Sequence, residues 1–221
     1  DDSLDAFIAR RAADLTAYQN AAYAKRYTDL IGRIGDTESE KTPGRTDLTE
    51  VAAKALYKLM AYKDEYEVAR LYTDGRFEAK LRDQFDAGAK LRFHLAPPLL
   101  AERDPGTGRL RKTEYGPWVF TAFRLLAGLK GLRGTAFDIF GRSEERRAER
   151  RLIAEYITTL ETLMTGLSDA NHEIATDIAR LPMSIRGFGH VKEANMATAV
   201  SRHESLMETF KNGGAEKTAA E

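Results

Sequence analysis

The chain has 221 residues, 43% of them hydrophobic and 31% charged, and its 34 basic and 34 acidic side chains cancel. This composition is typical of a globular protein and argues against general nucleic-acid affinity. Because the chain has no cysteine, it cannot form a disulfide, a thiolate zinc site or a cysteine-ligated iron–sulfur cluster. No apolar run approaches the roughly 20 residues that span a bilayer, and no signal-peptide pattern opens the chain, so a cytoplasmic protein is expected.

Helical periodicity dominates the first third of the chain. Residues 4–31 carry apolar side chains on one stripe and predict a first helix, whereas residues 35–45 are rich in turn formers and predict a loop. Asp47 and Glu50 have the spacing of a helix capping box, so a second helix is expected to begin at Asp47 and to end near Gly75. Within it, the carboxylates at 64, 65 and 67 could serve as a general acid and base, but ion pairing with nearby basic side chains is favoured: Lys58, Lys63 and Arg70.

The middle of the chain changes period. Leu91, Phe93 and Leu95 alternate with polar residues, which predicts a strand with one buried face. Turn formers occupy residues 104–108, and residues 109–115 follow as a second candidate strand. A small β-hairpin is therefore expected around residues 90–115.

The remaining segments again predict helices. Val119 to Leu129 is almost entirely apolar and is expected to form a buried helix. Ser143 precedes Glu144 and Glu145, which is the pattern of a capped helix start. The sequence thus predicts a mainly α fold, with residues 1–211 as a single multi-helix domain that carries the small hairpin and residues 212–221 as a disordered tail.

The four histidines do not predict a metal site. No two of His94, His172, His190 and His203 have the i, i+3 or i+4 spacing that places two ligands on one helical face. His203 lies on the apolar side of the last predicted helix, which favours a hydrogen-bonded packing role. His172 falls in a helix first turn and is expected to be exposed.

Two basic regions are candidates for anion binding. In the loop from Arg186 to Lys192, two glycines allow close backbone approach and Arg186, His190 and Lys192 are basic, so the loop is suited to a carboxylate or phosphate. A connector whose glycines cap two helices explains the same residues and is favoured. A second basic region suits an acidic partner or an anionic cofactor and comprises Arg109, Arg111, Lys112, Lys130 and Arg133.

Specific strings of residues carry a resemblance to a known family. Essentially the whole chain resembles the C-terminal region of the long, fused indolepyruvate (2-oxoacid) ferredoxin oxidoreductases, through strings at 59–72, 91–100, 116–118, 132–138 and 186–195. The resemblance implies a parent enzyme that oxidatively decarboxylates aryl-pyruvate-like 2-oxoacids. It also implies thiamine diphosphate, magnesium, coenzyme A and iron–sulfur clusters in upstream catalytic domains, with ferredoxin as the electron acceptor.

Within this chain the resemblance implies no catalytic residue and no cofactor. There is no cysteine for a cluster and no Gly-Asp-Gly segment followed by Asn for a magnesium diphosphate site. The expected function is therefore that of a non-catalytic domain that supports assembly or the substrate path of its parent, with no nucleic-acid or membrane partner and with homo-oligomers left open. The alternative is an anion-binding module for coenzyme A or a substrate carboxylate, formed by His94, Arg186, His190 and Lys192.

Overall fold

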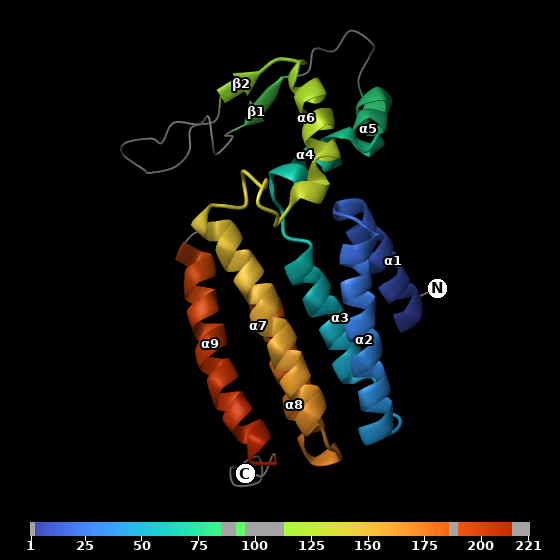
Figure 1. The fold of residues 1–221 in the computed structure, drawn as a ribbon, viewed down its shortest axis with the longest axis vertical. Coiled ribbons are helices and arrows are strands. Elements are labelled where there is room, and N and C mark those ends of the chain that lie inside the picture. Colours follow the sequence, from blue (N-terminus) through green and yellow to red (C-terminus); the bar gives the residue numbers. More distant parts are fainter. Residues whose placement is uncertain (1–2, 85–91, 96–112, 186–189, 214–221) are drawn as a thin grey trace. The chain divides into compact units, whose positions relative to one another are not determined.

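The fold is mainly helical, as the sequence predicts, with one small antiparallel hairpin (Figure 1). The computed structural model describes residues 3–84, 92–95, 113–185 and 190–213. Its α-helices within these ranges are α1 (Leu4–Tyr18), α2 (Ala21–Lys41), α3 (Asp47–Met60), α4 (Glu65–Thr73), α5 (Arg76–Gln84), α6 (Val119–Gly128), α7 (Glu144–Gly166), α8 (His172–Arg180) and α9 (His190–Lys211). Short 3-10 turns are η1 (Lys130–Leu132), η2 (Asp169–Asn171) and η3 (Leu181–Ser184), and the strands are β1 (Phe93–Leu95) and β2 (Thr113–Tyr115). No helix in the described ranges is both long and apolar enough to cross a bilayer.

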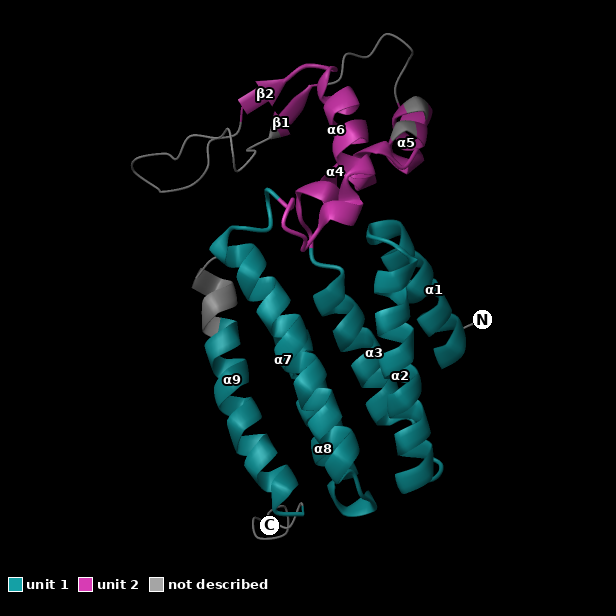
Figure 2. Cartoon of the chain, viewed as in Figure 1, with its two compact units in different colours: residues 1–62, 139–221 teal, residues 63–138 magenta. Residues whose placement is uncertain are grey.

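The chain divides into two compact units (Figure 2). Unit 1 comprises residues 1–62 and 139–221, and unit 2 comprises residues 63–138, which leave unit 1 after α3 and return to it before α7. Compact units within one chain are not by themselves separate folding domains, so the single domain expected for residues 1–211 stays a prediction. Most of the expected tail lies outside the described residues.

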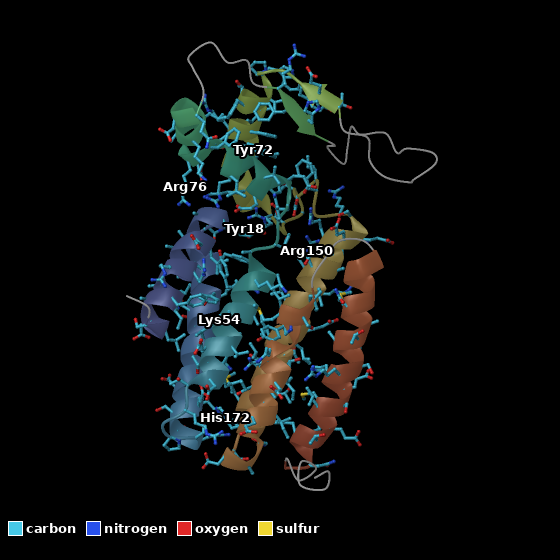
Figure 3. All side chains as sticks on the ribbon, turned by 180° about the vertical axis from the view of Figure 1, so that it is seen from behind. Tyr18, Lys54, Tyr72, Arg76, Arg150 and His172 are labelled. Atoms are coloured by element: carbon cyan, nitrogen blue, oxygen red, sulfur yellow. The ribbon has the colours of Figure 1, made fainter. Side chains whose placement is uncertain are left out.

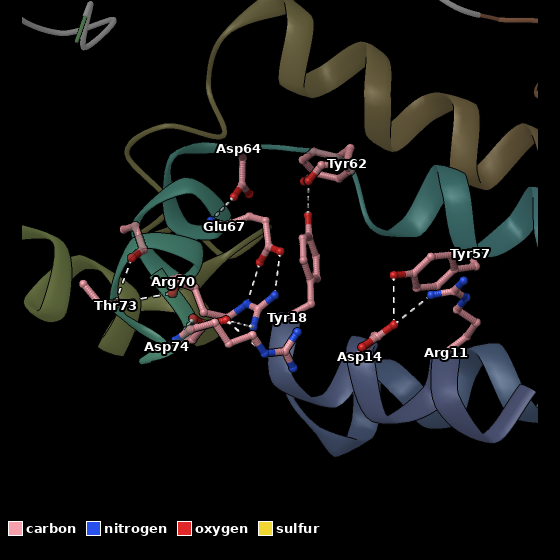
Figure 4. Close-up of polar contacts among 12 residues, drawn as sticks. Arg11, Asp14, Tyr18, Tyr57, Tyr62, Asp64, Glu67, Arg70, Thr73 and Asp74 are labelled. Carbon is pink, nitrogen blue, oxygen red and sulfur yellow. Dashed lines mark hydrogen bonds and ion pairs between the residues drawn. The ribbon is translucent and has the colours of Figure 1, made fainter. Parts of the chain in front are cut away.

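Unit 1 is a helical bundle in which α3 is central, since α3 contacts α1, α2, α7 and α8. Its core contains buried tyrosines whose hydroxyl groups donate to main-chain carbonyls instead of to water. The donor and acceptor residues are Tyr18 to Tyr62, Tyr23 to Met60, Tyr27 to Ala53 and Tyr156 to Ala179 (Figure 4 shows the first). Burial raises the pKa of Tyr27 and of Tyr156, so these phenols remain protonated donors.

The predicted first helix is in fact two helices. The first, α1, ends at Tyr18, and the Asn20 side chain starts α2 by accepting a hydrogen bond of 2.8 Å from the backbone amide of Tyr23. The predicted loop at 35–45 is wrong for its first seven residues, because α2 continues to Lys41. Ile34 and Glu38 face the core in this last part of α2, each only 1% exposed, and their burial favours helix over loop.

Unit 2 is built around an aromatic cluster. Tyr72 stacks on Phe123 at 5.4 Å between ring centroids and meets Phe93 edge-on at 5.7 Å. Phe93 in turn meets Phe120 at 5.1 Å, so α4, α6 and the hairpin share one core. The hairpin register pairs Phe93 with Tyr115, which confirms the small sheet predicted around residues 90–115.

The two ends of unit 2 are joined by a buried ion pair. The Asp64 carboxylate caps α4 by accepting from the amide of Glu67 at 2.8 Å (Figure 4), and it also accepts from Nε and, at 2.9 Å, from an Nη of Arg133. Close by, the Tyr66 hydroxyl donates to Asp138 at 3.2 Å. Since Asp64 and Asp138 lie at opposite ends of the segment, these contacts close unit 2 on itself.

Candidate functional site

A groove in unit 1 is lined mainly by apolar side chains. We call it the α7–α9 groove; its volume is about 310 Å³, and its walls come from α7, α8, η3 with the following Ile185, and α9, with Leu59 of α3. Pockets of this size, mostly apolar with a few polar groups, are typical of small-molecule sites. The apolar wall includes Leu152, Tyr156, Ile178, Pro182, Met196 and Val200, and the polar lining is Glu155, Thr159, His203 and Glu204.

Lys58 fixes one wall of this groove. Its ammonium group donates to the carbonyl oxygens of Pro182, Met183 and Ile185 at 2.7, 3.2 and 2.8 Å. An ammonium group has three protons to donate, and the Pro182 carbonyl also accepts from the backbone amide of Ile185 at 3.3 Å. Because Pro182 and Ile185 line the groove, Lys58 positions that wall from α3.

Thr159 and His203 meet at the polar end of the groove. The Thr159 hydroxyl is hydrogen-bonded to the carbonyl of Glu155 at 3.0 Å and lies 3.2 Å from Nε2 of His203. Which of the two side chains donates in the second contact depends on the tautomer of the imidazole. The contact confirms that His203 is a hydrogen-bonded packing histidine.

The electrostatics of the groove favour a neutral imidazole beside two carboxylates. Burial lowers the pKa of His203, and the nearby Glu204 and Glu155 oppose this shift without cancelling it. Glu155 and Glu204 are themselves exposed, and neither forms an ion pair with Lys or Arg among the described residues. The groove thus presents acceptors and negative charge.

A second feature is an apolar surface on unit 2, which we call the α6 apolar face. It consists of Trp118, Leu125 and Leu129, at positions i, i+7 and i+11, which fall on one side of a helix. Leu125 is 70% exposed and Trp118 62% exposed, and Phe137 in the following loop is 75% exposed. The expectation that residues 119–129 form a wholly buried helix is therefore wrong, because only the opposite face joins the aromatic core.

A buried polar network in unit 1 is the other place where titratable groups meet. Glu38, His172 and Thr49 are all buried, so the expectation that His172 is exposed is wrong (Figure 3 labels His172). Glu38 accepts from the backbone amides of Leu48 and Thr49, each at 2.9 Å, and from the Thr49 hydroxyl. Sequence reasoning missed Glu38, since a single Glu in a helix carries no signal of a distant partner.

The same network defines the state of His172. The Arg45 guanidinium, which can only donate, contacts Nδ1 of His172 at 3.1 Å, so Nε2 carries the proton and donates to Glu38 at 2.6 Å. Burial disfavours ionisation of Glu38, but the hydrogen bonds from Thr49, His172 and the Leu48 amide outweigh it and lower the pKa of Glu38. The Glu38 carboxylate contacts the first turn of α3, and the network is fully accounted for as a helix cap.

The residues predicted for anion binding are not assembled by the described structure. His94 is exposed in β1, opposite Glu114. Arg186 lies outside the described residues, and for His190 and Lys192 only the helical backbone of α9 is described. His94 belongs to unit 2 and the other three to unit 1, so the four-residue site stays a prediction.

The structure changes the interpretation of the second basic region. Arg133 is 4% exposed and binds Asp64, so it cannot meet an external acidic partner, and the predicted exposed role is wrong for this residue. Arg109, Arg111 and Lys112 lie outside the described residues. The interpretation of the carboxylates at 64–67 as ion-pair partners is confirmed for Glu67, which binds Arg70 through two hydrogen bonds of 2.7 and 2.8 Å.

The donor set of this chain does not fit a cysteine-ligated iron–sulfur cluster, since the sequence has no cysteine. Among the described residues, no group of three or more His, Asp or Glu side chains is arranged as a metal site.

Comparison with known proteins identifies the family of the chain. A protein-family model described as a family of unknown function, DUF6537, matches residues 4–205. No curated protein and no solved structure matches the chain. Since the match spans both units and nearly all of the sequence, the chain belongs to the DUF6537 family.

Proposed function

We propose that this chain is a non-catalytic helical domain of an indolepyruvate-type 2-oxoacid:ferredoxin oxidoreductase, and that it docks on the catalytic domains through the α6 apolar face. The observation that carries the proposal is that α6 is apolar on both sides. One side joins the aromatic core through Phe120 and Phe123, while the other exposes Trp118, Leu125 and Leu129. Exposed apolar side chains gathered on one face are typical of interaction surfaces.

The resemblance strings support this choice of partner. String 116–118 contains Trp118, and string 132–138 contains Phe137, so two exposed apolar residues fall within segments that resemble the enzyme family. Strings 59–72 and 132–138 also supply Asp64 and Arg133, whose ion pair closes unit 2. The strings that carry the resemblance therefore include the buried pair that closes unit 2, Asp64 and Arg133, and two residues exposed on its surface, Trp118 and Phe137.

In this proposal the redox chemistry belongs to the other domains. Thiamine diphosphate, magnesium and coenzyme A would be bound upstream, the clusters would be ligated by cysteines that this chain lacks, and ferredoxin would accept the electrons there. The contribution of this chain is burial of apolar surface, which stabilises an interface by about 1.5–3 kcal/mol for each large side chain that is fully covered. We place the assembled enzyme in the cytoplasm.

The first test is the full gene product. Cysteine motifs and a diphosphate site upstream in the same reading frame are expected, and their absence from the reading frame and from neighbouring genes would remove the proposed parent. The full-length protein should reduce ferredoxin or a viologen with an arylpyruvate and coenzyme A. Residues 1–221 alone should not, and activity of this segment alone would contradict a non-catalytic role.

The second test addresses the docking surface. Leu125→Glu in the full-length protein is expected to weaken association of the helical domain with the catalytic part, seen as faster limited proteolysis between them and lower specific activity. Leu71→Glu is a matched control, because Leu71 is a 42% exposed leucine of unit 2 that belongs to α4 and not to the α6 apolar face. Equal effects of the two variants would contradict docking through α6.

A further inference from the structure

The α7–α9 groove combines a cavity with two carboxylates that form no ion pair with Lys or Arg among the described residues, and the proposed docking of unit 2 uses neither feature. Its apolar wall accepts the body of a small ligand within about 310 Å³. Its polar end determines which head group the ligand carries.

Two carboxylates and one imidazole line the polar end. They belong to Glu155, Glu204 and His203, all residues that line the groove. The Thr159 hydroxyl is hydrogen-bonded to the carbonyl of Glu155 at 3.0 Å, within its own helix. A ligand that matches this end must donate hydrogen bonds and carry positive charge.

We infer that the α7–α9 groove binds a small protonated primary amine with an aliphatic or aromatic body. An alkylammonium group donates hydrogen bonds only, and the carboxylates of Glu155 and Glu204 accept them only. Its body would lie against Tyr156, Met196 and Val200. An organic anion of the same size is disfavoured, since it would bring a third negative charge beside two carboxylates.

The neutral state of His203 supports this selection. Burial lowers the pKa of His203, so at neutral pH the imidazole does not add a second cation to the site. Among the described residues, the titratable groups that line the groove with it are Glu155 and Tyr156 on α7 and Glu204 on α9. Protonation of His203 would place a cation beside the bound ammonium group.

The experiment uses 2-phenylethylamine as the probe, with 3-phenylpropionate and 3-phenyl-1-propanol as the anionic and neutral analogues. Binding to residues 1–221 is measured by saturation-transfer NMR and calorimetry. The amine is expected to bind at least about tenfold more tightly than the acid, from two favourable exposed charge contacts. Absence of amine binding, or equal binding of amine and acid, would overturn the inference.

Variants locate the binding to the groove. Val200→Trp places a large ring in the groove from a half-exposed position and is expected to abolish amine binding, whereas Arg202→Trp, at an exposed position outside the groove lining, is not. Glu155→Gln combined with Glu204→Gln should weaken amine binding about five- to tenfold, from loss of two exposed charge contacts, while the matched Glu208→Gln should not. If Val200→Trp has the circular dichroism spectrum of the wild type and binds the amine unchanged, the amine does not bind in the groove and the inference is wrong. The result is independent of the α6 face, which lies in the other unit.

Discussion

The Glu38 carboxylate and the His172 imidazole, 134 positions apart in the chain, are joined by a buried hydrogen bond of 2.6 Å. The same carboxylate caps the first turn of α3 through the amides of Leu48 and Thr49. The Thr46 side chain, at the N-cap position of α3, makes no capping hydrogen bond, so the cap is supplied by α2. One side chain thus ties the end of α2, the start of α3 and the start of α8 together.

Replacing Glu38 with Gln should destabilise the chain. The amide keeps the size of the side chain and one acceptor oxygen but replaces the other oxygen by a donor. Either the donors on Oε1, the Leu48 amide and His172, or those on Oε2, the Thr49 amide and hydroxyl, therefore lose their acceptor inside the core. The expected loss is about 2–4 kcal/mol in the free energy of unfolding, measured by urea denaturation. Glu40→Gln, an exposed change on the same helix, should alter it by less than about 0.5 kcal/mol. Similar losses in both variants would show that the network contributes nothing specific.

The contribution of Glu38 should depend on pH. Its pKa is lower in the folded chain than in the unfolded chain, so its stabilisation is complete above the unfolded value and is lost as the pH falls through the folded value. The difference in unfolding free energy between wild type and Glu38→Gln is therefore expected to shrink between neutral pH and about pH 3. Urea curves at intervals across this range measure it, and a constant difference would contradict a lowered pKa.

Features that depend on the local sequence pattern could be predicted from the sequence. Polar partners that are brought together only by tertiary contacts could not. The Ser143 cap, the hairpin near Phe93 and the hydrogen-bonded role of His203 follow from spacing and periodicity, and the structure confirms them. The exposed role expected of His172 and of Arg133 was wrong, because each is buried by a partner far away in sequence, Glu38 and Asp64. Apolar periodicity also did not distinguish the buried from the exposed face of α6, since both are apolar.

Breaking the Asp64–Arg133 pair should open unit 2. Arg133→Met leaves the Asp64 charge buried without its partner, which costs about 3–5 kcal/mol, whereas Arg133→Met combined with Asp64→Asn should recover part of this loss. Amide hydrogen exchange over residues 63–84 and 113–138 measures the opening. Arg92→Met removes an exposed ion pair with Glu114 in the same unit. It should change the free energy of opening, obtained from amide exchange, by less than about 1 kcal/mol. Equal exchange in the two arginine variants would remove the closing role of Arg133.

The two faces of α6 should respond differently to truncation. Phe123→Ala removes a ring that contacts Tyr72 and Phe93 and should destabilise unit 2 by about 3–5 kcal/mol. Leu125→Ala, two residues later on the α6 apolar face, should change the stability of the isolated chain by less than about 0.5 kcal/mol. Thermal unfolding followed by circular dichroism gives both values. A large loss in Leu125→Ala would mean that the chain itself covers this face, and the proposed docking surface would fail.

Lys58 should be needed for the shape of the α7–α9 groove. Lys58→Met removes the ammonium group that donates to the carbonyls of Pro182, Met183 and Ile185, with an expected loss of about 1–3 kcal/mol in the free energy of unfolding and faster amide exchange in η3. The matched control is Lys54→Met, one turn earlier on α3, where the ammonium forms only an exposed pair with Glu50, and the expected loss is under about 1 kcal/mol. Because Pro182 and Ile185 line the groove, Lys58→Met should also weaken binding of 2-phenylethylamine, whereas Lys54→Met should not. Faster exchange in η3 together with unchanged amine binding would mean that amine binding does not depend on this wall. That result would contradict the role given to Lys58.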